Sequence, residues 1–294
     1  MKKRLKILIA TDYSEQSLPA EIYAVNLAKD IDSYLQFVHV FDPPLAAPLA
    51  AFDAEKIEYN PLLFESKKLK NHVANLLNSL NNPLSDSDFT YLVREGQAGE
   101  QILEEAQESE IDIIIVGTHG VSGFRDFFVG THAWDVIKNS KIPALAIPTK
   151  TVYKRISTIG FASEYREGEI PAIHFAYNIA NLLKANFKIV HINNPFIKAK
   201  DNDQMFVDFY GTLQSILKTE NIEFIRMNED DVIEGIEKFC NETSVDWLAM
   251  SPEVPSLLEK IFIPNISMTR KMSFLTNRPL FAIPDKYQTE SGNF

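Results

Sequence analysis

The chain has 294 residues, about twice the length of a typical domain, so we expect two domains or one large one. Hydrophobic residues make up 45% of the chain and charged residues 23%, a balance that excludes a disordered, collagen-like or disulfide-scaffold protein. The formal net charge of −11 disfavours DNA, RNA and anionic membranes as partners, because binding to them needs Lys and Arg to neutralise phosphates.

The N-terminal residues argue against export. Residues 2–4 are basic, but the apolar run that follows is interrupted by Lys6 and ends at Ala10, too short and too polar for a secretory signal. No stretch of the sequence reaches the length needed to span a bilayer. The single cysteine, Cys240, fits a reducing compartment, and we expect it to be a buried apolar residue. We therefore expect a cytoplasmic protein.

Strand-length apolar runs alternate with amphipathic segments in the first half of the chain. The predicted strands lie near residues 5–11, 35–41, 89–94, 112–117 and 143–147. Ser14 is the predicted N-cap of a helix whose apolar face includes Ala20 and Ala24. A second helix is predicted between residues 94 and 112, with these glutamates on its solvated face: Glu100, Glu104, Glu105 and Glu108. This alternation predicts a doubly wound parallel α/β sheet, which binds ligands beyond the carboxyl ends of its strands.

Glycines follow the fourth predicted strand at a regular spacing. Gly117 and Gly120 come directly after the buried run, and Gly130 precedes Thr131 at the start of a predicted helix. Glycine lets the backbone take a positive φ and approach an anion without a Cβ clash, and a helix N-terminus presents unpaired N–H groups. The spacing predicts a phosphate cradle, although two glycines after a strand are equally typical of a tight turn.

The chain repeats itself once. Four segments match in the same order: 6–15 with 158–167, 37–40 with 189–192, 111–116 with 245–250, and 142–148 with 278–284. A repeat of this length predicts a tandem duplication, with domains at residues 1–148 and 149–294. We call these the first and second halves.

The first half carries an insertion. The offset between matched segments falls from 152 to 134 after the second segment, so the first half has 18 extra residues. The candidate is the Pro- and Ala-rich stretch 42–61, whose prolines exclude a regular central strand. It is expected to be a flap over the ligand site, part of an interface, or a surface loop with a short helix.

Three features together resemble the universal stress protein family and its ATP-binding branch. They are the spacing Gly-x2-Gly-x9-Gly-Thr, the pair Thr11-Asp12 after the first strand, and the run Val38-His39-Val40. The resemblance covers both halves and implies two Rossmann-like domains of the adenine nucleotide alpha hydrolase type, packed as a pseudo-dimer. Because the family dimerises through its last strand, it also implies that strands 144–147 and 280–283 lie at the contact between the halves. It also implies a regulatory role in the stress response, with ATP and a divalent cation such as Mg or Mn bound and ATP hydrolysed slowly at most. Whole chains could in addition form a homodimer.

The resemblance further assigns the nucleotide contacts. The expected set is Thr11, Asp12, Val40, Val116, Gly117, His119, Gly120, Gly130, Thr131 and His132. Asp12 would bond to the ribose or lie near the adenine edge, and Val40 and Val116 would contact the base. The glycines and Thr131 would hold the ribose and phosphates, and the backbone of His132 would add a donor. No residue is assigned to catalysis or to direct metal binding.

The second half departs from the motif at the cradle. The counterparts of Asp12, Gly117, Gly120, Gly130 and Thr131 are Glu164, Ser251, Val254, Pro264 and Asn265. A valine disfavours positive φ, and a proline lacks the N–H group that would face a phosphate. We therefore expect nucleotide in the first half only.

Other chemistries lack their motifs. The sequence contains no P-loop, no Ser-Gly-Gly cradle after its first strand, and no Gly-x-Gly-x2-Gly fingerprint. His39 and His191 recur at equivalent positions, and the half with the altered cradle keeps its histidine, so we interpret both as structural. Two functions stay open beside an ATP-binding regulator: a nucleotide-free interaction scaffold linked to stress, and a slow ATPase that uses Asp12 or the histidines His119 and His132.

Overall fold

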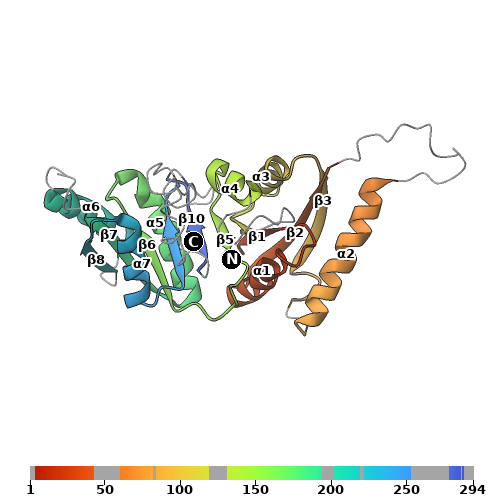
Figure 1. Ribbon diagram of the computed structural model, residues 1–294, viewed down its shortest axis with the longest axis horizontal. Helices are drawn as coiled ribbons and strands as arrows, with labels where there is room; N and C mark the ends of the chain where they lie inside the picture. The colour runs from red at the N-terminus through yellow and green to blue at the C-terminus, as the bar shows by residue number, and fades with distance from the viewer. Residues whose placement is uncertain are drawn as a thin grey trace, which may run out of the picture.

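The computed structural model of the protein describes residues 4–42, 60–81, 84–118, 131–193, 202–218, 222–252, 278–285 and 287. Ten strands in these residues form one sheet, in the order β3-β2-β1-β4-β5-β10-β9-β6-β7-β8 (Figure 1). The strands are β1 Lys6–Thr11, β2 Tyr34–Phe41, β3 Phe89–Glu95, β4 Ile113–Gly117, β5 Ala144–Ile147, β6 Thr158–Ala162, β7 Asn186–Asn193, β8 Glu223–Asn228, β9 Trp247–Met250 and β10 Leu280–Ala282.

The sheet consists of two parallel sets of five strands joined by one antiparallel pair. Each set has the same strand order, with β1 between β2 and β4 in the first and β6 between β7 and β9 in the second. The sets meet where β5 and β10 pair antiparallel, with Leu145 opposite Phe281. The strands that we expected at the contact between the halves therefore pair, and the five strands predicted in the first half are confirmed.

Helices cover both faces of the sheet, which confirms the doubly wound fold (Figure 1). They are α1 Leu18–Asp30, α2 Pro61–Ser79, α3 Ala98–Glu108, α4 Thr131–Asn139, α5 Ile170–Leu183, α6 Asn202–Leu217, α7 Val232–Glu242 and the short 3-10 helix η2 Glu167–Glu169. Side chains of α1, α2, α5 and α6 pack on one face together with Ile7 and Ile9 of β1. Those of α3, α4 and α7 pack on the other face with Leu8.

The start of α1 differs from the prediction. The helix begins at Leu18 with Ser17 as its N-cap, one turn after the predicted cap Ser14. Pro19 lies in the first turn, where its fixed φ suits a helix and its missing N–H leaves no intrahelical bond unmade. Ser14 instead accepts a hydrogen bond from the backbone N–H of Ser17 (3.1 Å) in the turn that precedes the helix.

One glutamate of α3 is buried rather than solvated, so the prediction for Glu105 is wrong. Its carboxylate accepts hydrogen bonds from Gln36 Nε2 of β2 (2.5 Å) and from Arg94 Nε of β3 (2.6 Å). Burial of a carboxylate is tolerated when it is paired and hydrogen-bonded. Helical periodicity in α3 could not reveal these partners, because both belong to strands that precede the helix.

Expectations about other single segments have different outcomes. Cys240 is buried in α7, as predicted, and burial raises the pKa of its thiol to about 12. Residues 43–59 of the insertion lie outside the described residues, but Asn60 at its end caps α2 by accepting from the backbone N–H of Leu63 (3.1 Å). No helix in the described part of the chain is long and apolar enough to cross a membrane.

Candidate functional site

The strand order of the first half reverses between β1 and β4. The chain passes from β1 to β2 and β3 on one side and later places β4 and β5 on the other. Ile9 of β1 lies opposite Ile115 of β4, so Asp12 and Gly117 come together at the carboxyl ends of these strands. In open parallel sheets, ligands bind at such a point. We call it the first switch point.

Thr11 and Asp12 organise the turn after β1. Asp12 Oδ1 accepts from the backbone N–H of Ser14 (3.0 Å), and Thr11 Oγ1 accepts from the backbone N–H of Tyr13 (3.1 Å). These bonds accompany a left-handed backbone at Tyr13, whose φ is 63°. Thr11 is 6% exposed, and its hydroxyl donates to the carboxylate of Glu21. Asp12 is only half-buried, so of this pair it is the more accessible side chain at the switch point.

Gly117 ends β4 and lies against the start of α1. A Cβ built at Gly117 would be 3.6 Å from the Cβ of Ala20 and 3.7 Å from the Cα of Ser17, which are ordinary contacts. Among the described glycines, only Gly96 has a positive φ. The positive φ that the sequence argument invoked is therefore not used at Gly117. Its small size leaves room between β4 and the turn before α1.

The other predicted contacts are placed only in part. Val116 is buried and Val40 is half-buried, and both pack on the face covered by α3 and α4. His119, Gly120 and Gly130 lie outside the described residues. Thr131 and His132 begin α4, and their side chains are also outside the description. The structure thus brings together the strand ends of the predicted site and leaves the phosphate cradle untested.

A buried carboxylate that the sequence reasoning missed lies beneath the turn. Glu21 of α1 is fully buried and accepts hydrogen bonds from Thr11 Oγ1, from Ser17 Oγ (2.9 Å) and from His72 Nε2 of α2 (2.5 Å). The hydrogen bond to Glu21 raises the pKa of His72 above 6.5. Glu21 lies on the apolar face of α1, and that position was the available signal that it is not solvated.

The two strand histidines support the same turn in both halves. The ring of Tyr13 stacks on His39 with 4.1 Å between centroids, and His39 Nδ1 lies 2.8 Å from the carbonyl oxygen of Thr11. In the second half, Tyr165 stacks on His191 at 4.2 Å, and His191 Nδ1 lies 2.9 Å from the equivalent carbonyl oxygen. Burial lowers the pKa of both histidines. This repeated geometry supports a structural role for the pair.

Comparison with known proteins identifies the family of the first half. Residues 3–148 match the family model described as the Universal stress protein family. Residues 3–148 are a universal stress protein domain. Universal stress protein MJ0531 of Methanocaldococcus jannaschii is 28% identical over 142 residues, which cover 48% of this chain and 81% of the relative. Universal stress protein YxiE of Bacillus subtilis is 26% identical over 147 residues, which cover 48% and 97%.

A solved structure extends the similarity of fold beyond the universal stress protein domain. The crystal structure of a universal stress protein from Archaeoglobus fulgidus matches 95% of this chain and 96% of its own, with a TM-score of 0.62 and 14% identity. At this identity the match shows the fold alone. The strand order of the second half, which repeats that of the first, agrees with it.

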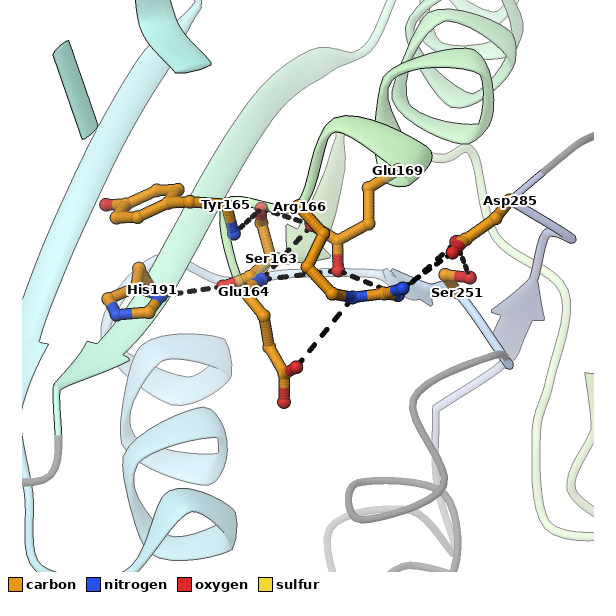
Figure 2. A network of polar contacts seen from close by, with 8 residues as sticks. All are labelled: Ser163, Glu164, Tyr165, Arg166, Glu169, His191, Ser251 and Asp285. Atoms are coloured by element: carbon orange, nitrogen blue, oxygen red, sulfur yellow. Dashed lines mark hydrogen bonds and ion pairs between the residues drawn. The ribbon is translucent and has the colours of Figure 1, made fainter. Parts of the chain in front are cut away.

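At the second switch point, the carboxyl ends of β6 and β9, the chain holds a network of charged side chains (Figure 2). The Arg166 guanidinium donates from Nη1 to Asp285 Oδ2 (2.7 Å) and from Nη2 to Glu169 Oε1 (3.4 Å). Arg166 Nε lies 3.8 Å from the carboxylate of Glu164. The hydroxyl of Ser251, which directly follows β9, donates to Asp285.

None of the charged members of this network except Glu164 has a charged counterpart in the first half. At the offsets of the sequence repeat, Arg166, Glu169, Ser251 and Asp285 correspond to Ser14, Ser17, Gly117 and Thr149. The two switch points therefore share a backbone frame and differ in charge. Sequence reasoning found the difference at Ser251 and missed the arginine network.

Proposed function

We propose that the protein is an ATP-binding regulator of the stress response, in which residues 1–148 hold the nucleotide and residues 149–294 form a second, nucleotide-free domain. The observation that carries the proposal is the meeting of Asp12 and Gly117 at the switch point of a universal stress protein domain. The half-buried carboxylate of Asp12 and the absence of a side chain at Gly117 fit a ribose and the first phosphates at this point.

The remaining contacts follow from the strand ends and from α4. Val40 and Val116 are the penultimate residues of β2 and β4, the strands on either side of β1, and would contact the base. Because α4 begins at Thr131, its first backbone N–H groups could bind phosphate oxygens. The proposed set is completed by Thr11, His119, Gly120, Gly130 and His132.

The proposed site favours binding over rapid turnover. Efficient phosphoryl transfer uses positioned cations, and residues 117–131 contain a single one, Arg125. The described residues contain no group of three His, Cys, Asp or Glu side chains arranged to hold a metal ion. We therefore expect Mg or Mn to be bound mainly through the phosphates of ATP, and any hydrolysis to be slow.

We also propose that the two halves form an internal pseudo-dimer. The antiparallel pairing of β5 with β10 supports it, and so does a buried contact in which Trp247 Nε1 of β9 donates to the hydroxyl of Tyr23 in α1 (2.5 Å). Trp247 and Tyr23 lie in a core cluster that extends across both halves.

An ATP titration with a matched pair of variants tests the proposed function. The full chain should bind ATP with Mg, and nucleotide retained through purification should be released by heat and identified by mass spectrometry. Asp12→Ala should weaken binding by about 10- to 100-fold, because a hydrogen bond to a charged group is lost. Glu164→Ala, the counterpart in the second half, should leave binding unchanged. A wild-type chain that binds no ATP would instead support the interaction scaffold.

A further inference from the structure

We propose that the side chain of Arg166 occupies the second switch point in place of a ligand. Its guanidinium holds together the loops that would otherwise surround a ligand, so that the second half keeps one conformation without any nucleotide. The comparison with a ligand rests on the proposed function of the first half. The network around Arg166 stands on its own contacts.

The contacts of Arg166 join segments that are far apart in the sequence. Glu164, Arg166 and Glu169 come from the turn between β6 and α5, whereas Asp285 follows β10. Arg166 bonds to both carboxylate oxygens of Asp285, with Nη1 at 2.7 Å from Oδ2 and Nη2 at 3.4 Å from Oδ1. Ser251 extends the network to the end of β9. The turn after β6 and the residue after β10 are thus connected through one guanidinium, and the end of β9 is connected to them through Asp285 (Figure 2).

Arg166 compensates the charge of carboxylates that are buried. The side chains of Glu169 and Ser251 are fully buried and Asp285 is 3% exposed, whereas the side chain of Arg166 is 34% exposed. Burial raises the pKa of Glu169, and the hydrogen bond from Ser163 and the charge of Arg166 oppose that rise. Removing one partner of a buried ion pair leaves the other charge uncompensated, which is strongly unfavourable.

Gly168, two residues after Arg166, lets the turn lie close to Asp285. A Cβ added at Gly168 would lie 3.1 Å from Asp285 Oδ2, tighter than most real contacts, so either the turn or the Asp285 side chain would have to shift by a few tenths of an ångström. The counterpart of Gly168 in the first half is Gln16, which has a side chain. A residue without a side chain at this position is therefore found in the second half and not in the first.

Hydrogen exchange of the full chain tests directly whether Arg166 holds these loops together. Arg166→Ser places the first-half residue at this position and should speed amide exchange in residues 163–169 and 283–285 by about tenfold or more, because local opening no longer breaks the network. Residues 11–17 should exchange as in the wild type. The control Arg4→Ser removes an arginine of the first half whose ion pair with Asp32 is exposed, and it should not change exchange in residues 163–169. Unchanged exchange there in Arg166→Ser would overturn the proposal.

A second variant covers a failure of Arg166→Ser to fold. Arg166→Lys keeps the charge but loses the planar, two-sided geometry. Exchange in residues 163–169 should then be faster than in the wild type. If it is not, Arg166 does not hold the loops and the proposal is wrong.

Added ATP separates this inference from the proposed function. In the wild type, ATP with Mg should slow exchange in residues 11–17 and leave residues 163–169 unchanged. Protection of residues 163–169 by ATP would show that the second switch point still accepts a ligand, and would overturn the role of Arg166. Protection of neither segment would refute ATP binding by the first half, while the comparison of Arg166→Ser with the wild type would still decide the role of the arginine.

Discussion

The described side chains at the two switch points differ in charge although the strands that position them are the same. At the ends of β1 and β4 the residues are small and neutral apart from Asp12, whereas at the ends of β6 and β9 an arginine joins three carboxylates. Below both points, a tyrosine with positive φ stacks on a strand histidine. The two halves therefore share the contacts that support the turn after their first strand, and they differ in the side chains that this turn presents.

The buried carboxylates Glu21 and Glu169 also combine a shared supporting contact with a different surrounding. Glu21 is in the first turn of α1, and Glu169 is the N-cap of α5, four residues earlier in the aligned helix. Both are fully buried, and both accept a hydrogen bond from the hydroxyl of the residue that follows or ends the first strand of their half. A buried carboxylate under the turn is thus present in both halves, but of the two only Glu169 also pairs with a charged residue of the switch point, Arg166.

The largest expected effect concerns the contact that both halves share. Trp247→Ala should lower the free energy of unfolding by about 3–5 kcal/mol, because a large side chain is removed from a core common to the two halves. Trp247→Phe keeps most of the ring contact and loses the bond to Tyr23, so it should cost about 1 kcal/mol. Urea denaturation of both variants measures the difference. Equal losses for the two would contradict this division between packing and hydrogen bonding.

The buried acid of the first half should come next. Glu21→Ala removes the acceptor for Thr11, Ser17 and His72 and should cost about 2–3 kcal/mol in the free energy of unfolding. Chemical denaturation at neutral pH provides the measurement. Glu100→Ala, on the exposed side of α3, is the control and should change stability by less than about 0.5 kcal/mol. A loss below that limit for Glu21→Ala would show that the network carries no stability.

The ion pair of His72 predicts a pH dependence of stability that His174 and His191 of the second half do not share, because burial lowers the pKa of both. The folded-state pKa of His72 is raised by its hydrogen bond to Glu21, so its stabilising effect is full below about pH 6.5 and is lost as the pH rises through the raised pKa. His72→Gln should therefore cost about 1 kcal/mol at pH 5.5 and progressively less at higher pH. Denaturation curves from pH 5.5 to 8.5 test this. A cost that does not vary with pH would exclude the charged pair.

The smallest effect on stability should come from exchanging a residue between the switch points. Gly117→Ser installs the residue found in the second half, and the new Cβ would make only ordinary contacts with Ala20 and Ser17. Stability should change by less than about 0.5 kcal/mol. Affinity for ATP should nevertheless fall if a nucleotide approaches the backbone here. Thermal unfolding combined with an ATP titration measures both, and unchanged affinity would remove Gly117 from the proposed site.

Much of the fold could be predicted from the sequence, because it depends on local patterns. Apolar runs located the five strands of the first half, and the family resemblance together with the internal repeat identified the strands that pair between the halves. Less of the candidate site could be predicted from the sequence. Arg166 and Asp285 are 119 residues apart and meet only through the sheet order, so no spacing revealed them. Glu105 was interpreted as solvated and Glu21 was missed, because their partners Gln36 and His72 belong to other elements. Gly117 was correctly placed at a strand end, but the reason given for a glycine there, a positive φ, does not hold in the structure.

The stoichiometry of nucleotide binding tests the central claim most directly. Native mass spectrometry of the full chain with ATP and Mg should show one nucleotide per chain across a wide range of concentration. Asp12→Ala should shift the appearance of that species to about 10- to 100-fold higher ATP concentration, and Glu164→Ala should leave it unchanged. Two nucleotides bound with comparable affinity would contradict the difference between the two switch points, and none would contradict nucleotide binding altogether.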